Sequence, residues 1–130
     1  MCHNLQNHVK ILCHCNDLKG LRLEHNIGLT CSSREAFGRV TIENMMAGLL
    51  VIGANSGGTS EIVQNEQTGL LYCVDDALDL SRCLKFVIEN PEQAAAITKQ
   101  GQKYAIDTYA IGSVVDRILD VYKNIISDRF

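Results

Sequence analysis

Residues 32–43, SSREAFGRVTIE, join a short apolar run to a stretch of helical periodicity. The apolar run is residues 27–31, and within residues 38–49 apolar side chains recur about every 3.6 positions, as they do on one face of a helix. The first N–H groups of a helix have no partner within it, and they present a partial positive charge that suits a phosphate. Gly38 would let such a ligand approach the backbone closely. The stretch therefore predicts a strand, a loop and a helix with an anion-binding turn.

Two carboxylates, Glu35 and Glu43, flank that turn with seven residues between them. A carboxylate beside a phosphate site is poorly suited to hold the phosphate, but it accepts hydrogen bonds well from vicinal hydroxyl groups. One glutamate on each side of the free N–H groups therefore fits a ligand made of a sugar, a diphosphate and a ribose. An exposed pair that only caps and solubilises the helix is the other interpretation of the same spacing.

Strands and helices alternate in the first part of the chain. Four short apolar runs, each bounded by Gly, Ser, Asn or Asp, predict buried strands at residues 9–15, 27–31, 50–53 and 69–73. A helix over residues 38–49 and a short turn at residues 58–64 lie between the last three runs. This order predicts a parallel sheet of about four strands flanked by helices.

The remainder of the chain has only helical periodicity. One helix runs to Asn90, a second begins at Pro91, and a third begins near Ile111 with an apolar stripe that continues to Ile126. We expect this last stripe to dock against the domain or against a neighbouring one. The expected fold is therefore α/β with a helical C-terminus.

Composition and charge narrow the class of protein. The chain has 130 residues, 46% of them hydrophobic, and a net charge of −3. These values predict one packed domain, and they argue against disorder and against binding to nucleic acid or an anionic membrane. No apolar run is long enough to span a membrane, and the first residues are not typical of a leader peptide. We expect a cytoplasmic protein whose six cysteines are free thiols.

The motifs together resemble a known family. The spacing of Glu35 and Glu43 is followed by MAG at residues 46–48, GGTSEIV at 57–63 and TGLL at 68–71. This order resembles the C-terminal, donor-binding domain of family-4 retaining glycosyltransferases, also called glycosyl transferases group 1. The resemblance implies a Rossmann-like domain of GT-B type, and residues 1–130 would form a single, incomplete copy of it that is truncated at its N-terminus.

The resemblance also implies a role for each residue of the turn. Six residues are expected to bind the donor substrate: Glu35, Phe37, Gly38, Arg39, Val40 and Glu43. Glu35, the expected catalytic residue, would bind hexose hydroxyls. The N–H groups of 37–38 would meet the sugar and those of 39–40 the diphosphate, while Glu43 would bind the ribose. Positioned donors rather than a metal would stabilise the leaving diphosphate, so we expect no cofactor, and a UDP-sugar rather than a GDP-sugar as donor.

The same resemblance implies that parts of the family's structure lie outside this chain. The acceptor half and a cationic pair for the phosphates are not among these residues, and Arg34 and Arg39 are the only cations expected nearby. Two lost charge-assisted contacts would weaken donor binding by about 3 to 6 kcal/mol, so we expect no activity from these residues alone. We expect residues 9–15, without their neighbours, to promote a homodimer or higher oligomer.

Other interpretations stay open at this point. The chain could be a non-catalytic module that binds a partner subunit through a sheet edge and its last helix, or a sugar-nucleotide epimerase of similar shape. The run Cys13-His14-Cys15 could bind zinc, although its two cysteines lie on one face of a strand without the usual C-x2-C spacing. Residues 57–61, GGTSE, could be a simple turn in which Thr59 or Ser60 caps a helix.

Overall fold

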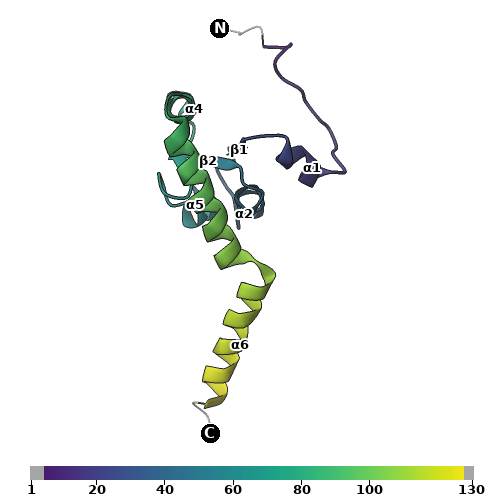
Figure 1. The fold of residues 1–130 in the computed structure, drawn as a ribbon, viewed down its shortest axis with the longest axis vertical. Helices are drawn as coiled ribbons and strands as arrows, with labels where there is room; N and C mark the ends of the chain where they lie inside the picture. The colour runs from purple at the N-terminus through teal and green to yellow at the C-terminus, as the bar shows by residue number, and fades with distance from the viewer. Residues whose placement is uncertain (1–4, 128–130) are drawn as a thin grey trace.

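The computed structural model describes residues 5–127, in which helices and strands alternate before the chain becomes helical (Figure 1). The elements are α1 (Leu18–Leu23), β1 (Ile27–Thr30), α2 (Arg39–Met46), β2 (Leu50–Ala54), α3 (Gly57–Ile62), β3 (Leu70–Tyr72), α4 (Ala77–Glu89), α5 (Pro91–Tyr109) and α6 (Ile111–Ser127). The strands form one parallel sheet in the order β1-β2-β3. The predicted α/β class with a parallel sheet and a helical C-terminus is confirmed.

The central strand β2 is covered on both faces. Every one of its residues, LVIGA, is buried, as is typical of a parallel strand between two layers of helices. In the register of the sheet, Ile27 of β1 lies opposite Leu50, and Ile52 lies opposite Leu70 of β3. The absence of a polar side chain in residues 50–54 is thus explained by the position of the strand.

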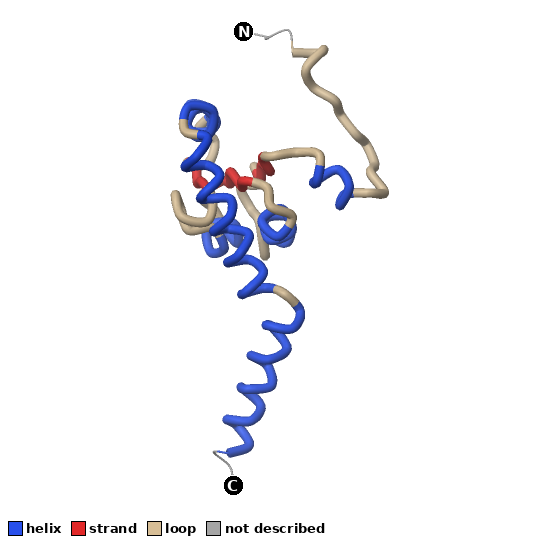
Figure 2. The backbone as a smooth tube through the Cα atoms, in the orientation of Figure 1, coloured by secondary structure: helices blue, strands red, loops and turns tan. Residues whose placement is uncertain are grey.

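Residues 9–15 are not a strand, so the prediction of about four strands is wrong by one. The segment is a loop that runs away from the sheet (Figure 2), and Ile11 within it is 84% exposed. A strand is stable only when a neighbouring strand takes its N–H and C=O groups, and none does so within residues 5–127. An apolar pattern shows which side chains avoid water but cannot show whether that neighbour is present.

A short helix that the sequence analysis did not predict, α1, follows this loop. The Asp17 carboxylate accepts a hydrogen bond from the Gly20 N–H at 2.8 Å and caps the helix start. The helix has six residues, which is too few to establish a periodic pattern by itself. Asp17 followed by apolar residues at Leu18 and Leu21 is the signal that could have revealed it.

The core lies in two layers, one on each face of the sheet. On one face, Leu50 and Ile52 pack with residues of α4 and α5 such as Cys83 and Ile97. On the other face, Val51 packs with α2, α3 and the later part of α5 in a cluster of buried side chains: Ile42, Met45, Ile62, Val63 and Ala105. Alternate residues of β2 therefore serve opposite layers, as the two-residue period of a strand requires.

Helix α5 begins where the sequence predicted, but the last helix, α6, does not pack as expected. Pro91 opens α5 at its first turn, and its fixed φ is compatible with that position. In contrast, α6 has no buried residue and extends away from the sheet (Figure 1), so the expected docking of its apolar stripe does not occur within residues 5–127. Arg117 donates to the main-chain carbonyl of Thr108 and so ties the first turns of α6 to the end of α5.

No helix in this described part has the length and apolarity that a membrane crossing requires.

Candidate functional site

The site is built on the loop between β1 and α2, at the carboxyl end of the parallel sheet. In open α/β sheets this end is where ligands bind. Gly38 is the N-cap residue of α2 and has a φ of 83°, in the left-handed region that favours glycine. A Cβ atom at Gly38 would lie 2.5 Å from Cδ1 of Ile62, the end of a side chain that can turn aside, so the positive φ is what requires glycine at the helix start. The predicted turn therefore exists, and its glycine is required by conformation.

Glu35 caps this turn from within the loop. Its Oε1 accepts a hydrogen bond from the Gly38 N–H at 3.0 Å. Gly38 therefore does not offer a free donor in this structure, although the sequence analysis expected one. The N–H groups of Phe37, Arg39 and Val40 have no hydrogen-bond partner among residues 5–127. Three of the four expected main-chain donors are thus unoccupied at the start of α2, where the helix dipole favours an anion.

The glycine pair Gly57-Gly58, at the start of α3, holds the Glu35 loop in place. The Gly58 N–H donates to the Glu35 carbonyl at 2.8 Å, and the Ser56 hydroxyl donates to the Ser33 carbonyl at 2.7 Å. A Cβ atom at Gly57 would lie 2.2 Å from the Glu35 carbonyl oxygen, and one at Gly58 would lie 2.5 Å from the carbonyl carbon of Phe37. The two backbones approach so closely that neither position has room for a side chain.

The hydroxyl residues of the same motif are not helix caps. The Ser60 hydroxyl donates back to the Gly57 carbonyl at 2.8 Å, and Thr59 is 1% exposed. The Thr59 hydroxyl lies 3.3 Å from that of Thr41, which in turn donates to the Thr30 hydroxyl at 3.5 Å. This row of three threonines joins α3, α2 and β1 beneath the loop. The suggestion that Thr59 or Ser60 caps α3 is therefore not what the structure contains.

Glu43, the second carboxylate, lies one turn further along α2 and its side chain is 42% exposed. Its Oε2 accepts a hydrogen bond from Nη2 of Arg22 at 2.7 Å. The sequence analysis considered only Arg34 and Arg39 as nearby cations and missed Arg22. The signal for Arg22 was absent because α1, the helix that carries it, was itself not predicted.

A small pocket of about 190 Å³ adjoins the loop, and Phe37, Gly58 and Tyr109 are among the residues that line it. Burial, together with a hydrogen bond to Tyr104, raises the pKa of Tyr109 to about 12. The Tyr109 hydroxyl therefore keeps its proton at neutral pH. The pocket thus lies between the Glu35 loop, α3 and the end of α5.

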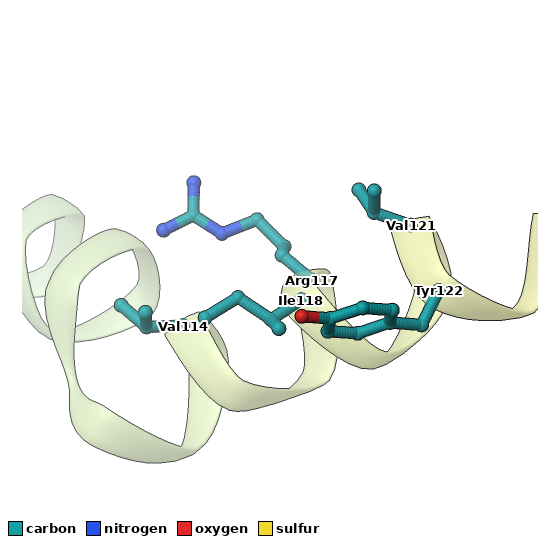
Figure 3. A pocket seen from close by; sticks show the side chains of 5 residues that line it. All are labelled: Val114, Arg117, Ile118, Val121 and Tyr122. Carbon is teal, nitrogen blue, oxygen red and sulfur yellow. The ribbon is translucent and has the colours of Figure 1, made fainter. Parts of the chain in front are cut away.

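Two of the larger hollows in the structure lie away from this loop. One, of about 650 Å³, lies between the start of β1, the end of α4 and α5, and it contains none of the predicted site residues. The other is a shallow depression along α6, and Figure 3 shows the side chains that line it: Val114, Arg117, Ile118, Val121 and Tyr122. Neither hollow brings ionisable groups together in a way that suits catalysis.

The zinc hypothesis finds no cluster in the structure. Among residues 5–127, no group of three or more His, Cys, Asp or Glu side chains is close enough to hold a metal ion. Cys13 is exposed and Cys15 is half-buried in the loop before α1. The residues of that loop do not converge on a common point.

Comparison with known proteins places this geometry in a family. The family model described as "Glycosyl transferases group 1" matches residues 2–104. The chain belongs to this family. Group 1 membership agrees with the resemblance seen in the sequence, because the matched region includes Glu35, Glu43 and the glycine pair.

The relatives of this group 1 chain include proteins named as glycosyltransferases. It is 32% identical over 92 residues to the D-inositol 3-phosphate glycosyltransferase of Rhodococcus jostii, a match that covers 71% of this chain and 20% of that protein. It is 30% identical over 112 residues to the alpha-1,3/1,6-mannosyltransferase ALG2 of Rhizomucor pusillus, covering 85% of this chain and 24% of that protein. The group 1 chain thus spans about a fifth to a quarter of the length of these relatives.

Solved structures share the fold. The crystal structure of Anabaena Alr3699/HepE in complex with UDP is 26% identical and superimposes with a TM-score of 0.86, covering 92% of this chain and 33% of that one. A glycosyltransferase from Rickettsia africae is 29% identical with a TM-score of 0.82, covering 94% of this chain and 33% of that one. The described architecture is therefore that of part of a GT-B glycosyltransferase.

Proposed function

We propose that this chain forms the donor-binding part of a retaining glycosyltransferase that transfers a hexose from a nucleotide diphosphate sugar. The observation that carries the proposal is the placement of two carboxylates, Glu35 and Glu43, on either side of the unpartnered N–H groups of Arg39 and Val40. Membership of group 1 supports the reaction class. The crystal structures of the Anabaena protein with UDP and with UDP-glucose support the class of ligand.

In the proposed complex each group meets one part of the donor. Glu35 binds hexose hydroxyls, and the N–H of Gly38 reaches the sugar when Glu35 exchanges its capping bond for those hydroxyls. Phe37 offers a further N–H to the sugar, and the diphosphate lies at the N–H groups of 39–40. The Glu43 carboxylate accepts from the ribose hydroxyls.

The chemistry that follows is electrostatic. When the bond between the hexose and the diphosphate breaks, negative charge builds on the diphosphate and positive charge on the sugar ring. Fixed N–H donors at the start of α2 stabilise the first of these charges without reorganising. Glu35 acts as the catalytic residue by holding the hexose in the reactive orientation. We assign no metal to this step.

The nucleotide and the acceptor are parts of the same proposal. We propose UDP rather than GDP as the carrier, and an acceptor site on a domain or partner chain outside these residues, because the matched relatives are several times longer than this chain. The residues described here would then bind the donor with a Kd of about a millimolar or weaker and transfer no sugar alone.

Nuclear magnetic resonance titration of the full 130-residue chain tests the proposal. UDP-glucose and GDP-mannose are added separately to the 15N-labelled protein up to about 20 mM, a ceiling set by the expected weak affinity. We expect the amide signals of Arg39 and Val40 to shift most, and to saturate at lower UDP-glucose than GDP-mannose. Shifts confined to another surface, or none at all, would refute the donor site.

A second candidate is association with another protein chain. Within residues 5–127, β1 pairs with β2 on one side only. Large apolar side chains of the loop before α1 and of α6 are exposed, among them Ile11 and Ile111, each 84% exposed. We propose that these surfaces promote a homodimer or higher oligomer. Size-exclusion chromatography with light scattering tests this, and a monomer at micromolar to millimolar concentrations would contradict it.

A further inference from the structure

Arg22 links the first helix to the second carboxylate of the proposed donor site. Its Nη2 donates to Oε2 of Glu43 at 2.7 Å, and its Nε donates to Oδ1 of Asn44 at 2.9 Å. The Arg22 side chain is only 17% exposed, although it carries a charge. A guanidinium offers several donors in a rigid plane, so two bonds in different directions fix its orientation.

Asn44 is itself held firmly, so the guanidinium has a fixed support. The residue is 7% exposed and packs against Gly28 of β1. A Cβ atom at Gly28 would lie 2.6 Å from Nδ2 of Asn44, so the strand makes room for the amide by having a glycine there. The sheet thus supports Asn44, Asn44 supports Arg22, and Arg22 reaches Glu43.

This chain of contacts leaves Glu43 with one oxygen engaged and one available. Oε1 of Glu43 has no hydrogen-bond partner within residues 5–127, and its side chain is 42% exposed. A carboxylate whose orientation is already fixed loses less conformational entropy when it binds a ligand than one on a free side chain. Its free oxygen then accepts a hydroxyl hydrogen without competition from Arg22.

We propose that Arg22 is a positioning residue that holds Glu43 in the orientation needed for the ribose hydroxyls. The inference rests on the proposed function, because it assigns a role within the same donor site. It adds a cation from α1 to a site otherwise formed by the loop and α2. A purely structural role, in which Arg22 only attaches α1 to α2, is the alternative to be separated by experiment.

The test compares UDP with 2′-deoxy-UDP, because a structural role for Arg22 would not alter the preference between them. In the wild-type chain we expect UDP to bind about tenfold more tightly, since a hydrogen bond to a charged group contributes on that scale. Arg22→Met is expected to reduce this preference to about twofold or less, because Glu43 is then no longer oriented. Arg22→Lys is expected to restore part of it, since an ammonium can donate to Glu43 but lacks the rigid plane in which Nε and Nη2 of arginine address Asn44 and Glu43 separately.

Lys103→Met is the matched control. Lys103 forms an exposed ion pair with Asp107 on α5, so its loss removes a cation without touching the site, and the wild-type preference should remain. Circular dichroism melting curves report whether each variant is folded. If Arg22→Met does not fold, Arg22→Gln keeps a neutral donor for Asn44, and it is expected to lose the preference in the same way.

The outcomes separate this inference from the proposed function. A folded Arg22→Met or Arg22→Gln chain that keeps the full preference for UDP refutes the role of Arg22 and leaves the donor site intact. A wild-type chain that binds UDP without preference over 2′-deoxy-UDP refutes the ribose contact of Glu43 and the role of Arg22 together. A wild-type chain that binds neither nucleotide refutes the donor site itself.

Discussion

The main-chain carbonyl of Glu35 accepts a hydrogen bond from the N–H of Gly58 at 2.8 Å, while the Glu35 side chain accepts one from Gly38. Glu35 is therefore fixed at both its backbone and its carboxylate, by Gly58 at the start of α3 and by Gly38 at the start of α2. The close packing of glycine backbone against the Glu35 loop makes this possible. The expected catalytic carboxylate is thus held in the loop before any ligand arrives, and in the proposed complex hexose hydroxyls replace the Gly38 N–H as its partner.

Gly58→Ala should disturb this arrangement strongly. The added Cβ would lie 2.5 Å from the backbone of Phe37, which has no flexible atoms that could move aside. We expect a loss of about 1 to 3 kcal/mol in the free energy of unfolding, measured by urea denaturation. Gly112→Ala is the control, because nothing lies within 4 Å of a Cβ atom there. That change within α6 should be neutral or stabilising by about 0.5 to 1 kcal/mol, and an equal loss for both variants would contradict the packing argument.

Glu35→Gln should separate the capping role of Glu35 from its proposed binding role. The glutamine side-chain oxygen can still accept from the Gly38 N–H, so we expect the melting temperature to change little. A neutral oxygen is a weaker acceptor for hexose hydroxyls than a carboxylate. UDP-glucose should therefore bind the variant more weakly than it binds the wild-type chain, while the affinity for UDP itself stays unchanged. Titrations of both ligands provide the measurement, and a parallel loss for both would contradict the assignment to the hexose.

Ile52→Ala should show that β2 is the centre of the core. Ile52 is 0% exposed and belongs to the layer that α4 and α5 cover. We expect a loss of about 2 to 5 kcal/mol in the free energy of unfolding, from lost burial and the cavity left behind. Ile88→Ala, at a position that is 77% exposed, should change it by less than about 0.5 kcal/mol. Thermal or urea denaturation gives both values, and similar losses would place Ile52 outside the core.

The thiol of Cys73 should be less reactive than its exposure suggests. A hydrogen bond to Asp79 and the negative charge of that carboxylate raise the pKa of Cys73, which reduces its thiolate fraction at neutral pH. Asp79→Asn removes the charge, so the pKa falls and alkylation by iodoacetamide at pH 8 should become roughly two- to tenfold faster. Peptide-resolved mass spectrometry measures the rate, with the exposed Cys13 as an internal reference that should not change. An unchanged rate at Cys73 would show that Asp79 does not govern it.

Local sequence spacing predicted the turn at the start of α2, while the binding roles of its residues stay a prediction. Gly38 and the glutamates are close in sequence, so a single loop and helix determine their arrangement. The glycine pair was recognised as part of a motif, but its close approach to Glu35 could not be predicted. The approach joins the loop after β1 to the start of α3, which follows a different strand. Short-range patterns indicate where turns and helices begin, but they do not indicate which distant segments of the chain are in contact.

Most features that the sequence did not predict depend on partners distant in the chain, whereas the missed bond from the Gly38 N–H to Glu35 is local. Residues 9–15 have the apolarity of a strand, yet strand formation requires a neighbour that the pattern cannot reveal. The ion pair of Arg22 and Glu43 joins two helices, one of which is only six residues long. A charged residue on so short a helix gives no periodic signal, so its partner becomes visible only in three dimensions.

The row of Thr30, Thr41 and Thr59 has a consequence for how this domain can vary among natural sequences. The Thr41 hydroxyl stands between the other two, and the Thr41 and Thr59 side chains are almost fully buried. Valine at position 41 alone would leave its neighbours without their shared bond at a cost of about 1 to 3 kcal/mol, whereas apolar replacements at all three positions could be nearly neutral. These positions should therefore change jointly during evolution, as a correlated trio.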